Sequence, residues 1–134
     1  MRTQRELRLR ADADGARDAA RAVRELLAAV DPIVAGACEL AVMEACANVV
    51  EHAYGHAGGT LRVVLRVSRV RFSAAVCDSG RWFDPSGATT ALPPATSEDG
   101  RGLALLELCM DRLQWRRVED ENRLLMARSL GEAA

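Results

Sequence analysis

The chain has 134 residues, of which 49% are hydrophobic, and its formal net charge is −1. A chain of this length and hydrophobic content is expected to fold as one domain over residues 1–134, and intrinsic disorder is excluded. The near-neutral charge favours neither nucleic acid nor a membrane surface as a direct partner. No apolar run is expected to reach the roughly 20 residues of a membrane span.

Cysteine and lysine usage narrow the chemistry further. The four cysteines show no metal-ligand spacing and lie in apolar contexts, so we expect buried free thiols in a reducing cytoplasm; they are Cys38, Cys46, Cys77 and Cys109. All 18 basic residues are arginine. The lack of lysine excludes a Walker-type phosphate loop and Schiff-base chemistry.

The first part of the chain predicts one strand and two helices. Leu7 and Leu9 alternate with charged residues, which is typical of a short strand. Apolar residues then recur at helical spacing over about 15–30. Asp31 followed by Pro32 indicates the start of a second helix, which should run to about residue 54, where glycines follow.

The rest of the chain predicts two hairpins and a third helix. Apolar residues alternate over 61–67 and 70–76, which indicates a β-hairpin turning near Ser68 and Arg69. A loop rich in proline, glycine, serine and threonine covers 85–100, and loops of this length are often lids. A helix over 103–110 and a hairpin of 113–115 and 124–126, with a turn over 119–122, should follow. This order predicts an α+β fold, a two-layer sandwich with helices on one face of a largely antiparallel sheet.

Glu44 and Asn48 are the only polar residues in the apolar run LAVMEACANVV. Residues four apart on a helix share a face, so the carboxylate and the amide should point to one place. They could bond each other or a neighbouring loop at a partly buried helix. They could also face hydrated Mg²⁺, with the carboxylate accepting a proton from an attacking hydroxyl.

Asp78 ends the second strand of the first predicted hairpin, and Gly80 follows. Asp78 has the parity of the apolar positions, so its carboxylate should face inward, where it could accept a hydrogen bond from an exocyclic amine. Gly80 would let the backbone approach a flat ring. Asp-x-Gly after a strand is also an ordinary turn sequence.

The segment Gly100-Arg101-Gly102-Leu103 is expected to open the third helix after the long loop. Backbone N–H groups and the helix dipole at such a helix start can bind phosphate, and Arg101 could clamp it. An ordinary loop-to-helix turn with an exposed arginine would have the same sequence.

The order of these motifs resembles the ATP-binding domain shared by gyrase, Hsp-ninety-type chaperones, histidine kinases and MutL, the GHKL superfamily with its Bergerat-type fold. Within it, EACANVVEHAY, CDSGRWFDP and GRGLALLELCMD resemble the bacterial anti-sigma-factor serine kinases. The resemblance covers about residues 5–130.

The resemblance implies a role for each motif. Glu44 would be the general base and Asn48 the Mg²⁺ ligand. Asp78 would receive the adenine amino group, with Gly80 beside the ring. Residues 85–100 would form a lid over ATP, and the remaining matched residues would bind the nucleotide at the third helix: Gly100, Arg101, Gly102 and Leu103.

The sequence departs from the family pattern at two places, and a histidine near the first motif has an open role. The aspartate motif usually continues with a second glycine, and Trp82 stands there, where it could narrow the adenine pocket or pack under the lid. The final strands lack the threonine that many relatives present to adenine. His52, four residues beyond Asn48, could support the site or simply pack at the helix end.

The function implied is a cytoplasmic anti-sigma factor with serine kinase activity. It would phosphorylate a STAS-type antagonist protein, bind an RNA polymerase sigma factor and form a homodimer. The alternative is a partner-binding regulator of the same fold that uses ATP only as a ligand or not at all. A histidine-kinase ATPase domain is a third reading, disfavoured because no helix with a phosphoacceptor histidine precedes it.

Overall fold

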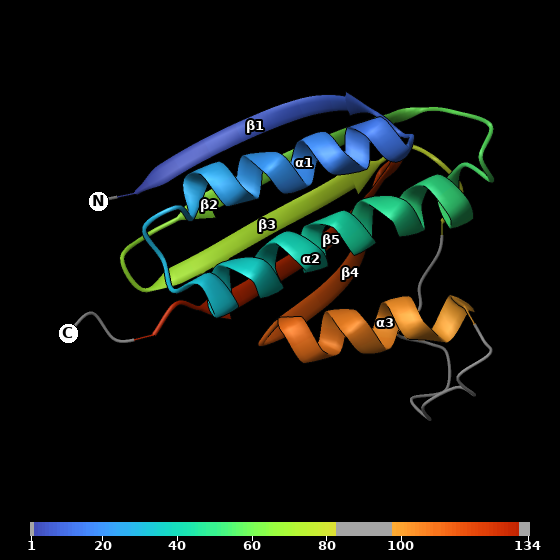
Figure 1. The fold of residues 1–134 in the computed structure, drawn as a ribbon. Helices are drawn as coiled ribbons and strands as arrows, with labels where there is room; N and C mark the ends of the chain where they lie inside the picture. Colours follow the sequence, from blue (N-terminus) through green and yellow to red (C-terminus); the bar gives the residue numbers. More distant parts are fainter. Residues whose placement is uncertain (1, 83–97, 132–134) are drawn as a thin grey trace.

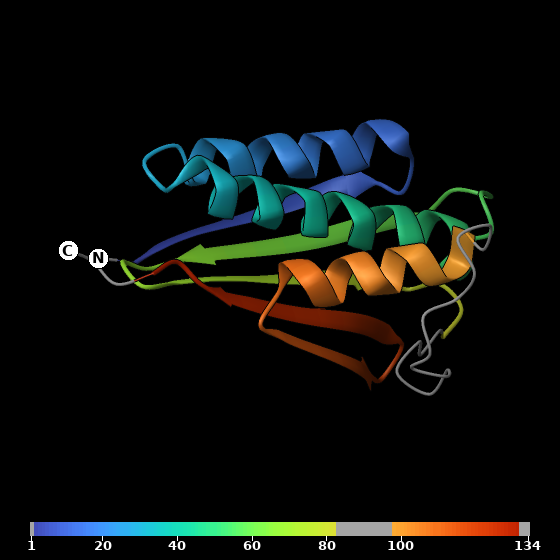
Figure 2. The ribbon, with the colours of Figure 1, turned by 60° about the horizontal axis from the view of Figure 1, so that its bottom comes forward.

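The computed structural model describes residues 2–82 and 98–131 as one five-stranded sheet with helices on one side. In spatial order the strands are β1 (Thr3–Arg10), β2 (Thr60–Val67), β3 (Arg71–Asp78), β5 (Glu121–Ser129) and β4 (Arg112–Val118). Helices α1 (Ala13–Leu26), α2 (Pro32–Asn48) and α3 (Glu98–Cys109) cover a single face of this sheet (Figures 1 and 2). Every described strand pair is antiparallel. The predicted α+β sandwich is confirmed.

The two-residue period of the strands decides which side chains face the helices. One cross-strand row on the helix side consists of Leu7, Val63, Val76, Leu124 and Trp115. These side chains pack with the buried faces of α1 and α2, so a single core lies between the two layers. All four cysteines are free and buried, as expected.

Both N-terminal helices start at aspartate caps. The Asp12 carboxylate accepts a hydrogen bond from the backbone N–H of Gly15 at 2.8 Å, and Asp31 accepts one from Ile33 at 2.8 Å. The start of α2 at Pro32 is confirmed. The first helix is shorter than predicted, because it ends at Leu26 and its apolar pattern continues through a turn.

The end of α2 differs from a regular helix. A π-helical segment, η1 (Val49–Ala53), continues α2. The backbone N–H of Tyr54 ends this segment by donating a hydrogen bond to the Val49 carbonyl. The combined stretch Pro32–Ala53 is 22 residues long with a mean hydropathy of 1.7. The expectation that no apolar run would reach the length of a membrane span is therefore wrong. The core accounts for only part of this apolar composition, because Ile33, Leu40 and Met43 of α2 are exposed.

The third helix starts earlier than the sequence suggested. It begins at Glu98, so Gly100 and Gly102 lie within its first turns and do not precede it. Two acidic residues, Glu98 and Asp99, stand before the glycines, and acidic residues favour a helix N-terminus. Residues 85–97 of the expected lid lie outside the described residues, and 98–100 belong to α3.

Candidate functional site

Gly102 brings the first and third motifs into contact. A Cβ atom added to Gly102 would lie 2.5 Å from Oε1 of Glu44, and 3.1 Å from Oδ1 of Asn48. Helix α3 therefore lies against the polar positions of α2 so closely that any side chain at Gly102 would have to displace the end of the Glu44 side chain. The sequence predicted that Glu44 and Asn48 share a face, and the structure places both against this one residue of α3.

Within the described part of the chain, neither the Glu44 carboxylate nor the Asn48 amide makes a hydrogen bond or an ion pair. Both residues are only half-buried. The alternative in which they satisfy each other is not what the structure shows. Two polar groups that have no partner among residues 2–82 and 98–131 leave oxygen atoms available to a ligand on this face of α2.

The oxygen donors at Glu44 and Asn48 fit Mg²⁺, which prefers hard oxygen ligands and keeps several waters. Among the described residues, no group of three or more histidine, cysteine, aspartate or glutamate side chains could hold a metal ion. A cation here would depend on phosphate oxygens and water to complete its shell. The site thus fits a metal that arrives with a phosphorylated ligand.

A pocket lies next to Asn48, between the end of α2 and the sheet. Its empty volume is about 460 Å³, which includes space open to solvent. Its walls come from α2 with η1, from the end of β3 and from β4 and β5, and the residues are Ala45, Asn48, Val49, Ala53, Val76, Asp78, Arg81, Trp82, Trp115, Asn122, Arg123 and Leu124. Asn48 and Asp78, from separate sequence motifs, therefore line one pocket.

Asp78 is the buried acid of this pocket, only 7% exposed. Its Oδ1 atom accepts hydrogen bonds from the backbone N–H of Gly80 at 2.9 Å and from the amide of Asn122 at 2.7 Å. Burial raises the pKa of the Asp78 carboxyl, and these two hydrogen bonds oppose the rise. No described group donates a hydrogen bond to Oδ2, so this oxygen has no partner among the described residues.

Asn122 is the site residue that the sequence reasoning missed. The residue was assigned to a turn, but the turn is shorter and Asn122 lies in β5, directly opposite Asp78. Its amide also donates to the carbonyls of Gly80 at 3.1 Å and Arg81 at 3.2 Å, and its oxygen accepts from Arg117. The available signal was its parity with the core positions Leu124 and Met126 of the same strand.

The segment after Asp78 is also fixed by the end of the second helix. A Cβ atom on Gly80 would lie 2.5 Å from the carbonyl oxygen of Ala53, and that oxygen accepts a hydrogen bond from Arg81 N–H at 2.8 Å. The Tyr54 hydroxyl accepts a hydrogen bond from the Ser79 N–H at 3.0 Å and donates one to the backbone carbonyl of Thr60. The π-helical segment therefore positions the strand end that holds the buried acid.

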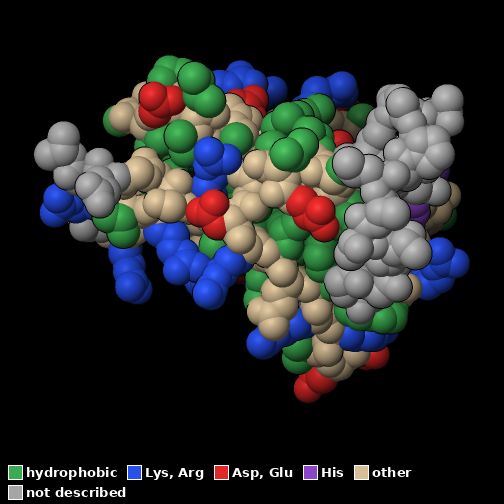
Figure 3. Space-filling model, turned by 90° about the horizontal axis from the view of Figure 1, so that it is seen from below, with side chains coloured by type: hydrophobic (Ala, Val, Ile, Leu, Met, Phe, Trp, Pro, Cys, Tyr) green, Lys and Arg blue, Asp and Glu red, His purple; other side chains and the backbone are tan. Residues whose placement is uncertain are grey.

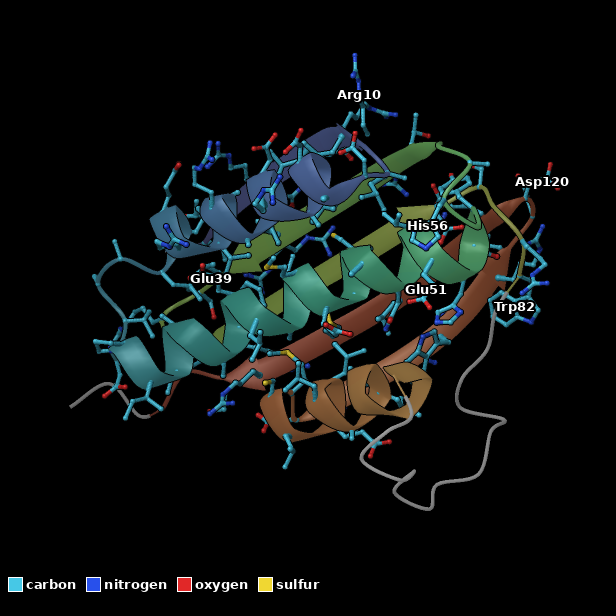
Figure 4. All side chains as sticks on the ribbon, turned by 45° about the vertical axis from the view of Figure 1, so that its right-hand side comes forward. Arg10, Glu39, Glu51, His56, Trp82 and Asp120 are labelled. Atoms are coloured by element: carbon cyan, nitrogen blue, oxygen red, sulfur yellow. The ribbon has the colours of Figure 1, made fainter. Side chains whose placement is uncertain are left out.

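Trp82 stands in the pocket wall and is 38% exposed. In Figure 4 it lies at the end of the sheet where η1 finishes and where Asp120 marks the β4–β5 turn. Trp82 therefore lines the pocket, and the expectation that it could narrow the adenine site stays a prediction. The other expectation, that Trp82 packs under the lid, concerns residues 85–97, which lie outside the described ranges.

The remaining predicted positions are less directly placed. Gly100 and Arg101 lie in the first turns of α3, where side chains are not described. Leu103 is half-buried and does not line the described pocket. His52 lies in η1, whose π-helical geometry differs from the α-helical geometry on which the expected four-residue stacking on Asn48 depends. Its Nε2 atom is 3.8 Å from Oε2 of Glu51.

A model of the histidine kinase-like ATPase domain matches residues 9–128. Serine-protein kinases RsbW from Halalkalibacterium halodurans and Bacillus cereus are 34% and 31% identical over 84 residues, which is 57% of this chain. The matches cover 51% and 52% of those proteins, so the chain spans about half the length of the curated relatives it matches.

A solved structure supports the fold. The crystal structure of the RsbU and RsbW domains of a Mycobacterium tuberculosis protein matches with a TM-score of 0.69 and 21% identity, covering 95% of this chain and 32% of that one. The expected family resemblance is confirmed by the family model, which extends over most of the sequence. This chain belongs to the family of histidine kinase-like ATPase domains.

Proposed function

We propose that this chain is an anti-sigma factor that binds ATP with Mg²⁺ and phosphorylates a serine of a STAS-type antagonist protein. The observation that supports it most is the contact of Gly102 with Glu44 and Asn48, beside a pocket that contains Asp78. Similarity to serine-protein kinases RsbW supports the kinase class. Binding of an RNA polymerase sigma factor, a homodimer and a cytoplasmic location belong to the same proposal.

Each residue has one task in this proposal. The free Oδ2 of Asp78 accepts the adenine amino group, and Gly80 leaves room for the ring. Asn48 would hold Mg²⁺, which neutralises phosphate charge when bound. Free backbone N–H groups in the first turn of α3, that of Gly100 among them, bind phosphate oxygens. Gly102 lies just beyond them and leaves room for the phosphates because it has no side chain. Arg101 and Leu103 complete the phosphate site, and residues 85–97 form the lid.

The transfer step needs a proton acceptor. The serine oxygen forms a bond to the γ-phosphorus while the bond from that phosphorus to the β–γ bridging oxygen breaks, and ADP leaves. Glu44 orients the serine hydroxyl and accepts its proton. Because Glu44 makes no ion pair among the described residues, its carboxylate is available for this role.

The test is transfer of radiolabelled γ-phosphate from ATP to a cognate antagonist. Wild type should label the antagonist, and an antagonist with its acceptor serine changed to alanine should stay unlabelled. Glu44→Gln should retain ATP binding and lose about a hundredfold or more of the rate. ATP binding without transfer to the cognate antagonist would favour the alternative, a non-catalytic partner-binding regulator.

A further inference from the structure

The face of the sheet opposite the helices is divided into two electrostatic halves. Near the β4–β5 turn, Glu121 accepts from Arg62 at 2.7 Å and from Arg123 at 2.6 Å. Arg62 also lies 3.3 Å from Glu6. In this half Arg62 and Arg123 therefore have carboxylates of the chain itself as partners, whereas Arg116, opposite Arg123, forms no ion pair among the described residues.

The other half, near the β2–β3 turn, has arginines without acidic partners. Arg66, Arg71 and Arg112 are exposed and border one hollow, whose empty volume is about 670 Å³ including space open to solvent. Among the described residues none of the three forms an ion pair, and Arg66 donates only to the side-chain oxygen of Gln4, at 3.0 Å. In Figure 3, arginine side chains (blue) project from this side of the sheet at its left end.

The strand register fixes the spacing of these three arginines, named here the arginine face. Arg66, Ser73, Ala127 and Arg112 form one cross-strand row from β2 to β4. Three strand spacings place the two arginines roughly 14 Å apart. Arg71 lies two residues from Ser73 along β3 and on the same side of the sheet, about 7 Å from the row.

The floor between the arginines carries no charged side chain. It combines small or aliphatic residues with two neutral polar ones, and they are Val64, Ala75, Leu125, Ala127, Ser73 and Gln114. None of the described aromatic residues lines the hollow. Proteins that bind single-stranded nucleic acid use aromatic stacking platforms, so this surface lacks that feature. The net charge of −1 also opposes long-range attraction of a nucleic acid.

We propose that the arginine face binds an acidic, extended protein segment. In an extended chain, alternate side chains share a side, and residues i and i+4 lie about 13 Å apart. Carboxylates at i and i+4 would match Arg66 and Arg112, and a neighbouring one would reach Arg71. The planar guanidinium group suits paired contacts to carboxylates. This surface is separate from the nucleotide pocket, on the opposite face of the sheet.

The probe is a fluorescein-labelled twelve-residue peptide of alternating aspartate and serine, with asparagine replacing aspartate in a control peptide. Fluorescence anisotropy at low salt should show binding of the acidic peptide only, weakening as salt rises. The variant R66Q/R71Q/R112Q should bind about tenfold more weakly, from the summed effect of three exposed charge pairs.

A matched variant, R17Q/R21Q/R24Q, removes the same charge from α1 and should change affinity by less than about twofold. No binding by the wild type, or equal weakening in both variants, would overturn the proposal. A labelled DNA strand that binds more tightly through the same arginines would reassign the face to nucleic acid. Self-association that disappears in R66Q/R71Q/R112Q would reassign it to a second copy.

The outcome is independent of the kinase proposal. Circular dichroism should show both arginine variants folded, and calorimetry should show that they bind ATP as the wild type does. A failure of ATP binding in all three proteins would contradict the proposed kinase function and leave the arginine face untouched.

Discussion

The two ends of the candidate site are built in different ways. At the Asp78 end, buried polar groups bond each other and the backbone, so the carboxylate has a fixed position before any ligand arrives. At the Glu44 end, the carboxylate and amide of α2 make no bonds among the described residues and face Gly102 of α3. The Asp78 end is therefore preorganised. The Glu44 end has side-chain oxygens that make no bond among the described residues and that a metal ion or a ligand could contact.

The difference corresponds to what each end would bind. A flat ring with one amine needs a single acceptor in a rigid place, because a buried site that leaves hydrogen bonds unmade loses affinity. A triphosphate with a hydrated cation needs several weaker contacts that form together. A packed network suits the first ligand group, and exposed oxygens beside a helix start suit the second.

Asp78→Asn should have the largest effect, at the preorganised end. The substitution keeps the shape of the side chain but removes the charge that accepts the adenine amine. Affinity for ATP should fall by about 10- to 100-fold, the range for a hydrogen bond to a charged group. Calorimetry measures it, with circular dichroism as the control. Unchanged affinity would show that the ring does not contact this carboxylate.

Gly80→Ala should destabilise the fold. The new Cβ atom would meet the backbone oxygen of Ala53, which cannot move aside as a side chain can. We expect a loss of about 1–3 kcal/mol in the free energy of unfolding, measured in urea. Gly36→Ala is the control, because no atom lies within 4 Å of its added Cβ. It should gain about 0.5–1 kcal/mol in helix α2. Equal effects would contradict the close packing at Gly80.

Gly102→Ala should affect binding more than stability. Its Cβ would meet the end of the flexible Glu44 side chain, which can move, so unfolding should change little. The moved carboxylate and amide would then misplace the phosphates, and affinity for ATP with Mg²⁺ should fall about tenfold. A large loss of stability with normal affinity would place this contact in the core and not in the site.

Asn122→Ala should shift the pH dependence. The pKa of Asp78 is raised by burial, and the Asn122 amide opposes that rise. Binding of ATP needs the carboxylate, so affinity should fall as the pH drops through this raised pKa, and should begin to fall at higher pH in the variant. The same raised pKa means that the charged Asp78 destabilises the folded state above it, a penalty relieved on acidification. Titrations of both proteins from pH 7 downward test this, and identical profiles would contradict it.

The two layers of the fold, the start of α2 and the inward position of Asp78 could be predicted from the sequence alone. Alternation over β2 and β3 and the cap at Asp31 depend on local patterns, and these patterns survive in the structure. Asp78 was placed correctly as an inward-facing strand end because strand parity is a local property.

Features that depend on contacts between distant segments could not be predicted in the same way. The pairing of Asn122 with Asp78 depends on the register of β3 and β5. In the sequence, the four polar residues 119–122 are typical of a turn, so the start of β5 was not recognised. The π-helical segment that positions Gly80 also has no sequence signature. The start of α3 was predicted two residues too late, because Gly100 was taken as the opening of the helix and Glu98 and Asp99 as part of the preceding loop.

The most direct test of the account is calorimetric titration of the protein with ATP, with and without Mg²⁺, for wild type and Asn48→Ala. We expect Mg²⁺ to strengthen ATP binding to the wild type and this gain to largely disappear in Asn48→Ala, while binding without the metal is similar in both proteins. Folded wild-type protein that binds no ATP, or an equal gain from Mg²⁺ in both proteins, would contradict the assignment of Glu44 and Asn48 to a metal–nucleotide site.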